Sequence, residues 1–207
     1  MSHRDEAQHN PPNLIFTYGT LKRGFANHGL LQSLFSTNDA AFLGTYRTAE
    51  ELPLVCGPHG VPFLLNFPGS GLGRHRVRGE LYAVSDHGLT RLDELEGISV
   101  GHYERLPIRL LPDGDSSIGG GGGGATVVEA EAYYAHRSFA EDMWRRNGWL
   151  GFEVYTEEAC KAHSNLENSK VTYTQTSLHY HYDPWFTVLG QELASIELSR
   201  VFRSSDF

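Results

Sequence analysis

The chain has 207 residues, of which 40% are hydrophobic and 12% aromatic, and this is enough for one domain with a substantial core. Its net charge of −8 at pH 7 argues against a nucleic-acid-binding protein, because bulk positive charge is missing. No stretch approaches the ~18 apolar residues of a membrane span, and residues 1–12 lack the apolar segment of a secretory signal. We therefore expect a cytoplasmic protein that does not bind membranes.

The composition changes along the chain and predicts three parts. Residues 1–12 are polar, end in two prolines and are predicted to be disordered. Residues 13–163 carry the apolar segments of a folded domain, interrupted at 112–125 by a flexible loop with six consecutive glycines. Residues 164–207 are polar and weakly periodic, and we interpret them as an atypical C-terminal extension. The His-Tyr-His-Tyr run at 179–182 lies there and is read as polar surface, because two histidines two positions apart are by themselves a weak metal-binding signal.

The first part of the predicted domain combines short strands with one helix. A strand is predicted over Leu14–Tyr18. Asn27 can cap a helix whose apolar residues recur at helical spacing through 30–35. Ala41–Tyr46 and Val61–Phe67 are predicted strands, with prolines in the loops around them.

The second part continues the strand pattern around one more helix. Val77–Val84 alternates, and the sequence places Arg78 and Glu80 on one face as a solvated pair. Strands are also predicted over Tyr103–Leu111 and Thr126–Ala135. Many short strands with one or two helices predict an α+β domain on a closed or nearly closed sheet.

The two cysteines, Cys56 and Cys160, form neither a disulfide framework nor a metal-binding motif. The sequence allows a disulfide between them but favours free buried thiols.

A carboxylate on the apolar side of a helix is the first candidate for chemistry. Ser85 is suited to cap a helix that runs through Glu96 and ends before Gly97. Glu96 comes seven residues after Leu89 and four after Leu92, so it shares their apolar stripe. Burial and the negative end of the helix dipole both raise the pKa of such a carboxyl group. The spacing therefore makes Glu96 a candidate general base near neutral pH.

A structural role for Glu96 is the alternative that spacing leaves open. At a fraying helix end, Glu96 could point outward and pair with Arg105 or Arg91. On the same helix, Asp93 and Glu94 are predicted to project toward solvent.

The second candidate is the turn Tyr18-Gly19-Thr20-Leu21, which directly follows the first predicted strand. Free backbone N–H groups in this turn, together with the helix start near Asn27, could hold a carboxylate. A tight turn without a ligand is the alternative, and the segment by itself favours it.

Extended to Gly24, this segment resembles the opening of the gamma-glutamylcyclotransferase superfamily. The likeness is greatest to the gamma-glutamylamine cyclotransferase branch and its plant avirulence-induced-gene-like relatives, since the glutathione-specific branch carries serine where Thr20 stands. Residues 13–160 continue the resemblance in order through Pro53-Leu54-Val55, Val61-Pro62-Phe63-Leu64-Leu65, Gly79-Glu80-Leu81-Tyr82, Leu92-Asp93-Glu94-Leu95-Glu96 and Tyr103-Glu104-Arg105. The glycine run and residues 164–207 depart from the family pattern.

The resemblance implies a small mixed β-barrel flanked by a few helices, with a cavity at one end. It implies cyclisation of a γ-glutamyl amine, such as γ-glutamyl-ε-lysine, to 5-oxoproline with release of the free amine. Glu96 would be the catalytic acid and base, without a metal or other cofactor. The substrate would be held by Tyr18, Gly19, Thr20 and Leu21. Tyr103 is a candidate cavity wall, with a core tyrosine as the alternative.

Two other functions stay open for the same cavity. It could transfer the γ-glutamyl group to another amine, or bind a γ-glutamyl ligand without turning it over.

Overall fold

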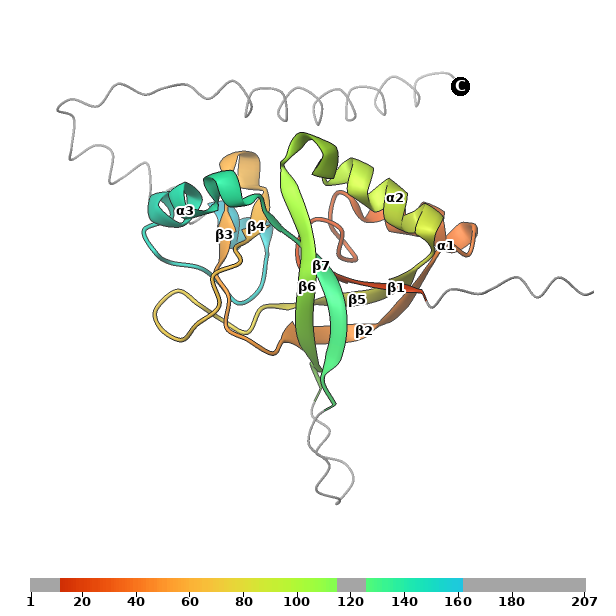
Figure 1. Ribbon diagram of the computed structural model, residues 1–207, viewed down its shortest axis with the longest axis horizontal. Helices are drawn as coiled ribbons and strands as arrows, with labels where there is room; N and C mark the ends of the chain where they lie inside the picture. The colour runs from red at the N-terminus through yellow and green to blue at the C-terminus, as the bar shows by residue number, and fades with distance from the viewer. Residues whose placement is uncertain (1–11, 115–125, 162–207) are drawn as a thin grey trace, which may run out of the picture.

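The structure is a computed structural model that describes residues 12–114 and 126–161 (Figure 1). The glycine run and the C-terminal extension with its His-Tyr-His-Tyr run lie outside these residues, and so does the predicted disordered N-terminal segment apart from residue 12. Within the described ranges, none of the helices has the length and apolar content needed to cross a bilayer.

Five strands close into the small mixed barrel that the resemblance implied, and this prediction is confirmed. They are β1 (Asn13–Thr17), β2 (Ala40–Thr48), β5 (Arg78–Val84), β6 (Tyr103–Pro112) and β7 (Val128–Ala135). Neighbours pair antiparallel in the order β1-β5-β2-β6-β7. A parallel pairing of Ile15 with Glu131 and Phe16 with Ala132 then joins β7 back to β1.

Two short strands extend the sheet beyond the barrel. β3 (Leu54–Cys56) pairs with β4 (Pro62–Leu64) across the 3-10 turn η1 (Pro58–Gly60), and β4 pairs with β7. The sequence predicted a longer strand in place of β4 and did not predict β3. Three residues are too few to show a period of two, so only the tertiary pairing defines these strands.

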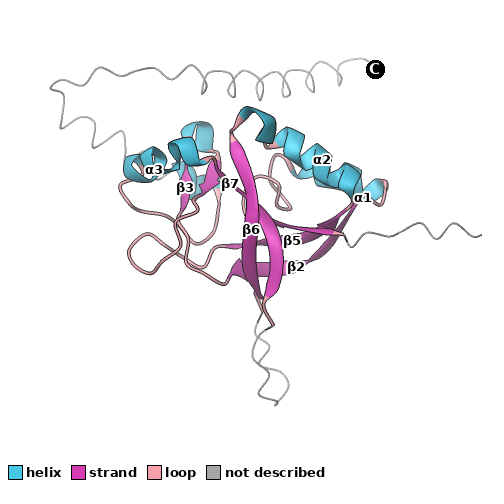
Figure 2. Ribbon diagram, viewed as in Figure 1, coloured by secondary structure: helices cyan, strands magenta, loops and turns pink. Residues whose placement is uncertain are grey.

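Three helices and a 3-10 turn complete the described elements. They are α1 (His28–Ser36), α2 (Asp86–Leu95), η2 (Ile98–Val100) and α3 (Arg137–Arg146). Figure 2 shows the helices gathered toward one end of the strands, while the β6–β7 hairpin extends beyond the other end. The sequence predicted α1 and α2, and it missed α3.

The core consists of two hydrophobic clusters on opposite faces of the strands. Ile15 belongs to the cluster that α1 and α2 cover, whereas the next residue, Phe16, belongs to the cluster inside the barrel. On β5, Leu81 and Tyr82 divide in the same way. The barrel wall is therefore buried on both faces where the helices lie, and a polar side chain on β5 must find partners there.

Glu80 on β5 shows this consequence and corrects the sequence prediction. It is only 8% exposed and accepts hydrogen bonds from the Arg23 backbone N–H (2.9 Å), from Arg23 Nε (3.1 Å) and from the Tyr82 hydroxyl (2.7 Å). Arg78 pairs with Glu153 instead (3.0 Å). The predicted solvated pair was wrong, because alternation cannot show that both faces of the strand are covered.

The cysteine prediction also requires correction. Cys56 on β3 and Cys160 are joined by a disulfide, with their Cα atoms 5.4 Å apart. The segment after α3 returns to β3 and brings together two residues that are 104 positions apart. This juxtaposition arises from tertiary structure and has no local signal.

Candidate functional site

A pocket opens beside the end of β1 and holds about 310 Å³ of space free of protein atoms, its opening to solvent included. Its lining residues are Phe16, Thr17, Tyr18, Gly19, Thr20, Leu21, Pro62, Glu96, Tyr103 and Tyr133. Every residue that the sequence singled out for the site is among them. The sequence did not predict four of the lining residues: Phe16, Thr17, Pro62 and Tyr133. The first two directly precede the predicted turn.

The loop from β1 to α1 is fixed by short-range hydrogen bonds. The Lys22 N–H donates to the Gly19 carbonyl (3.1 Å), and the Asn27 N–H donates to the Thr20 carbonyl (3.0 Å). Asn27 Nδ2 also donates to Thr20 Oγ1 (3.0 Å), so this side chain holds the loop and does not cap α1 as predicted. His28 Nδ1 lies 3.0 Å from the Leu21 carbonyl.

Three consecutive backbone N–H groups in this loop have no hydrogen-bond acceptor among the described residues. Those of Gly19, Thr20 and Leu21 donate to no acceptor in the described part of the chain, although all three residues line the pocket. Backbone N–H groups in folded proteins normally have a partner. Successive N–H groups in a turn form a fixed positive region that suits a carboxylate or an oxyanion.

Gly19 is required by a close approach of backbone to proline. A Cβ atom at this position would lie 2.6 Å from Cγ of Pro62 on β4. Any other residue would therefore push the loop away from the opposite pocket wall.

Two tyrosine hydroxyls hold the pocket walls together. The Tyr18 hydroxyl donates to the Tyr133 carbonyl (2.6 Å) and accepts from the Leu64 N–H (3.2 Å), which ties the loop to β7 and β4. The Tyr103 hydroxyl donates to the Pro62 carbonyl (3.1 Å). Burial raises the pKa of both phenols well above its usual value, so both remain neutral. Tyr103 is thus both a buried residue and a pocket wall.

Glu96 stands at the end of α2 as its C-cap. Its N–H donates to the Leu92 carbonyl (3.0 Å), and Gly97 follows in the left-handed conformation (φ 62°) that ends the helix. Glu96 is half-buried and lines the pocket. Burial, and next the charge of Asp93, raise the pKa of this carboxyl group to about 8.

The alternative reading of Glu96 as a surface ion pair does not hold. Arg105 contacts Asp93 through Nε (3.1 Å), and Arg91 pairs with Glu94 (3.4 Å). Among the described residues, the Glu96 carboxylate has neither a hydrogen-bond donor nor an ion-pair partner. Asp93 was predicted to face solvent and instead lies half-buried, because Arg105 reaches it from β6.

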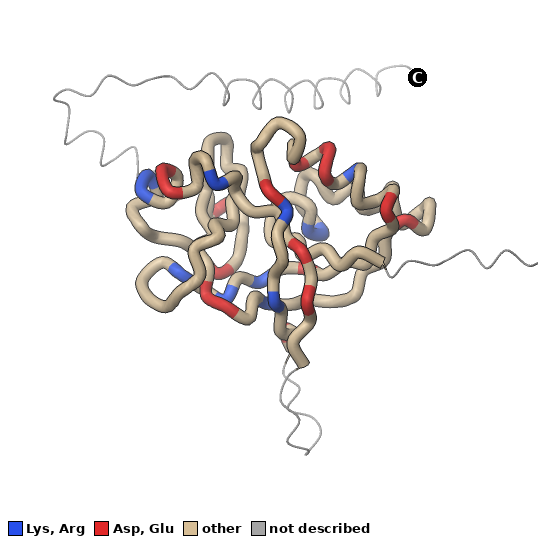
Figure 3. Tube along the Cα trace, in the orientation of Figure 1, with Lys and Arg blue, Asp and Glu red and all other residues tan. Residues whose placement is uncertain are grey.

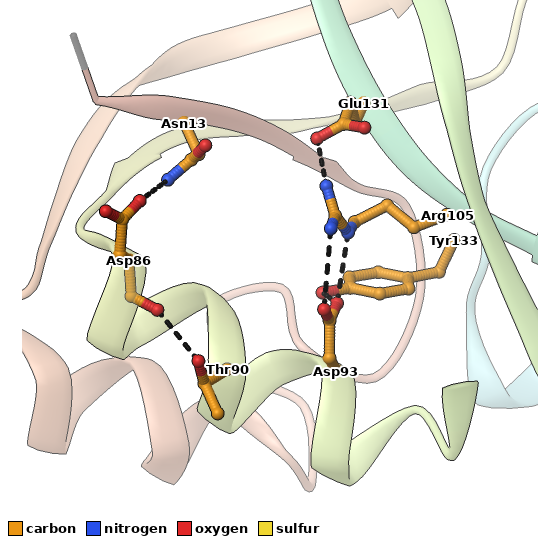
Figure 4. Close-up of polar contacts among 7 residues, drawn as sticks. All are labelled: Asn13, Asp86, Thr90, Asp93, Arg105, Glu131 and Tyr133. Atoms are coloured by element: carbon orange, nitrogen blue, oxygen red, sulfur yellow. Dashed lines mark hydrogen bonds and ion pairs between the residues drawn. The ribbon is translucent and has the colours of Figure 1, made fainter. Parts of the chain in front are cut away.

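Asp93 is the centre of a polar network next to the pocket (Figure 4). Its Oδ1 accepts hydrogen bonds from Arg105 Nε (3.1 Å) and from the Tyr133 hydroxyl (2.7 Å). Arg105 in turn pairs with Glu131 on β7. Figure 3 shows acidic and basic positions interspersed along β6 and β7, where this ion pair lies. In the part of the chain that the structure covers, no group of three or more His, Cys, Asp or Glu side chains could hold a metal ion.

Comparison with known proteins extends these observations. The family model "Gamma-glutamyl cyclotransferase, AIG2-like" matches residues 15–150, which is more than half of the chain and includes every pocket residue. The chain belongs to this family. The predicted resemblance is confirmed.

Individual relatives agree with the family assignment. The Arabidopsis thaliana protein named "Putative gamma-glutamylcyclotransferase" is 54% identical over 155 residues, which is 72% of this chain and 80% of that protein. Human gamma-glutamylaminecyclotransferase is 45% identical over 103 residues, covering 48% of this chain and 64% of the human protein, less than two thirds of its length. The crystal structure of an AIG2-like protein from Mus musculus superimposes with a TM-score of 0.55 at 30% identity and covers 71% of this chain and 90% of that one.

Proposed function

We propose that this member of the family cyclises the γ-glutamyl group of a γ-glutamyl amine to 5-oxoproline and releases the amine. One observation carries the proposal. A carboxyl group with a pKa of about 8 and without a partner in the described residues lines the same pocket as three unused backbone N–H groups. One group can move protons near neutral pH, and the others can hold negative charge.

The main requirement of the proposed reaction is that the protein holds the substrate in its reactive conformation. The substrate's α-amino nitrogen forms a bond to its own γ-carbonyl carbon, and the amide bond to the leaving amine breaks. Well-oriented intramolecular reactions of this kind gain roughly 7–11 kcal/mol over bimolecular ones. The main task of the pocket is therefore to fold the substrate into a five-membered ring.

Glu96 is proposed as the acid and base of this reaction. The α-ammonium nitrogen loses two protons as it becomes the ring N–H, and the leaving nitrogen gains two as it departs as an alkylammonium. A carboxyl group whose pKa is about 8 is partly ionised near neutral pH and can both accept and deliver protons. General acid–base catalysis of this type contributes about 10²- to 10⁴-fold.

The loop after β1 is proposed to bind the negative charge of the substrate. The N–H groups of Gly19, Thr20 and Leu21 would receive the α-carboxylate or the oxyanion that forms at the γ-carbon. Tyr103 would be a wall of the binding site, since its hydroxyl is already bonded to Pro62. Support for an amine as leaving group comes from the Tyr18–Gly24 segment and from the human relative's name.

The test is release of 5-oxoproline from γ-glutamyl-ε-lysine, γ-glutamyl-alanine and glutathione by the wild type and by Glu96→Gln. The proposal expects release by the wild type, a preference for a γ-glutamyl amine, and loss of release in the variant. A new amide in place of 5-oxoproline would show acyl transfer instead. No turnover by a folded wild type that still binds these compounds would show a binding module.

A further inference from the structure

Asp93 lies three residues before Glu96 on α2, and both oxygens of its carboxylate accept hydrogen bonds from other parts of the barrel. Arg105 reaches it from β6 with Nε 3.1 Å from Oδ1 and one terminal nitrogen 3.5 Å from Oδ2, a two-pronged contact. Glu131 on β7 binds another nitrogen of the same guanidinium. Arginine held between two carboxylates has its orientation fixed by both, which makes it a rigid clamp.

Asp93 is connected to the pocket through Tyr133. The Tyr133 hydroxyl donates to Asp93 Oδ1 (2.7 Å), its side chain lines the pocket, and its backbone carbonyl accepts the hydrogen bond from Tyr18 (2.6 Å). Asp93 is therefore linked through one residue to the start of the loop with the three unused N–H groups. Figure 4 shows Tyr133 and Arg105 converging on Asp93 at the end of α2.

Four titratable side chains from different parts of the fold interact with the charge of Glu96. Tyr18 follows β1, Tyr103 belongs to β6, Tyr133 to β7, and Asp93 to α2 itself. Burial raises the pKa of each of these phenols, so the tyrosines contribute no charge. Among the described residues, Asp93 is therefore the charge that acts most directly on Glu96.

We propose that Asp93 is a positioning residue: clamped by Arg105, it fixes the Tyr133 wall of the pocket and keeps a negative charge beside Glu96. This inference rests on the proposed function, in which Glu96 carries the protons. The Asp93–Arg105 pair would then do more than join α2 to the barrel: it would also set the charge beside Glu96 and the position of Tyr133.

Two variants that each remove one charge distinguish an electrostatic effect on Glu96 from a purely structural role. The proposal predicts that they shift the acidic limb of the pH profile in opposite directions. In Asp93→Asn the repelling charge is lost, and the acidic limb of the kcat/KM profile should move to lower pH by about half a unit. In Arg105→Gln the positive charge that partly neutralises Asp93 is lost. Asp93 then repels the ionised form of Glu96 more strongly, and the acidic limb should move to higher pH. A purely structural pair would lower stability in both variants without shifting the limb in opposite directions.

The same helix offers matched controls. Glu94→Gln and Arg91→Gln remove the same charges from an exposed pair that does not line the pocket, and solvent screens them. Both controls should leave the acidic limb where the wild type has it. Tyr133→Phe keeps the ring and the charge of Asp93, and it should lower kcat/KM without moving the limb.

Titration of Glu96 by carbon-13 NMR of its carboxyl group supplies a readout that does not depend on turnover. The titration midpoint should fall in Asp93→Asn and rise in Arg105→Gln, even if the wild type proves to have another activity. Shifts in the same direction, no shift, or equal shifts in the control variants would overturn the inference. Loss of turnover in the wild type would count only against the proposed function.

Discussion

The backbone N–H of Arg23 donates to Glu80 Oε2 (2.9 Å), and Arg23 Nε lies 3.1 Å from Oε1 of the same side chain. The buried carboxylate of Glu80 on β5 thus accepts hydrogen bonds from both the backbone and the side chain of Arg23. Glu80 does not line the pocket. It holds the loop whose earlier residues do.

Replacing Glu80 by alanine should therefore loosen the loop without touching the site. The change removes a hydrogen-bonded buried charge and leaves the Tyr82 hydroxyl without its acceptor, at an expected loss of about 1–3 kcal/mol in the free energy of unfolding. We expect a raised KM with a smaller effect on kcat. Urea denaturation and steady-state kinetics measure the two effects, and an unchanged KM would contradict the proposed anchoring.

The contact between Gly19 and Pro62 makes a second prediction. Gly19→Ala should move the loop because the new methyl group would lie 2.6 Å from Pro62 Cγ. Displacing substrate-holding groups by about 1 Å can cost roughly 10- to 100-fold in rate. Kinetics of the double variant Gly19→Ala/Pro62→Ala supply the control, since removal of the ring carbon should restore part of the activity. An active single variant would argue against a rigid loop.

Elements with complete local signals were predictable from sequence. Helix α2 has Ser85 as N-cap, whose hydroxyl accepts from the Gly88 N–H (3.0 Å), and Gly97 ends it in a left-handed conformation. Helix α3 buries Ala140 and Trp144 and was missed. Gly148 ends it in a left-handed conformation (φ 64°), but its N-cap position holds His136, which is not a common capping residue. Without an N-terminal signal, its position depends on tertiary packing.

The site divides in the same way. Glu96 could be found because a carboxylate on an apolar stripe is visible in one sequence segment. The partners of Asp93 could not, since Arg105 and Tyr133 come from two barrel strands whose register no local pattern sets. Pro62 likewise reaches the pocket only through the pairing of β4 with β7.

The disulfide between Cys56 and Cys160 should matter for stability. It closes a loop across 104 positions and ties the segment that carries Tyr155 to β3. Cross-links of this kind stabilise by about 2–4 kcal/mol, so reduction or Cys160→Ser should lower the melting temperature. The Tyr155 carbonyl accepts a hydrogen bond from Lys22 Nζ (3.2 Å), so local opening should also reach the loop after β1. Calorimetry with and without reductant tests this, and identical transitions would contradict it.

The raised pKa of Glu96 makes stability depend on pH. Its usual pKa is 4.5, and in the folded protein burial and then Asp93 raise it to about 8. Between these values the unfolded chain has lost the proton that the folded protein retains, so the free energy of unfolding should fall as pH rises through this window. The penalty should be roughly 1–3 kcal/mol after allowance for solvent in the pocket.

Glu96→Gln should abolish this dependence, because the amide resembles the protonated acid and does not titrate. The variant should therefore be inactive yet more stable than the wild type at pH 9, and close to it at pH 5. Chemical denaturation of both proteins across this range measures the difference. Glu94→Gln is the matched control, since its exposed side chain should leave the wild-type profile unchanged. Parallel profiles for wild type and Glu96→Gln would mean that Glu96 is not a buried group with a raised pKa, and the proposed acid–base role would lose its basis.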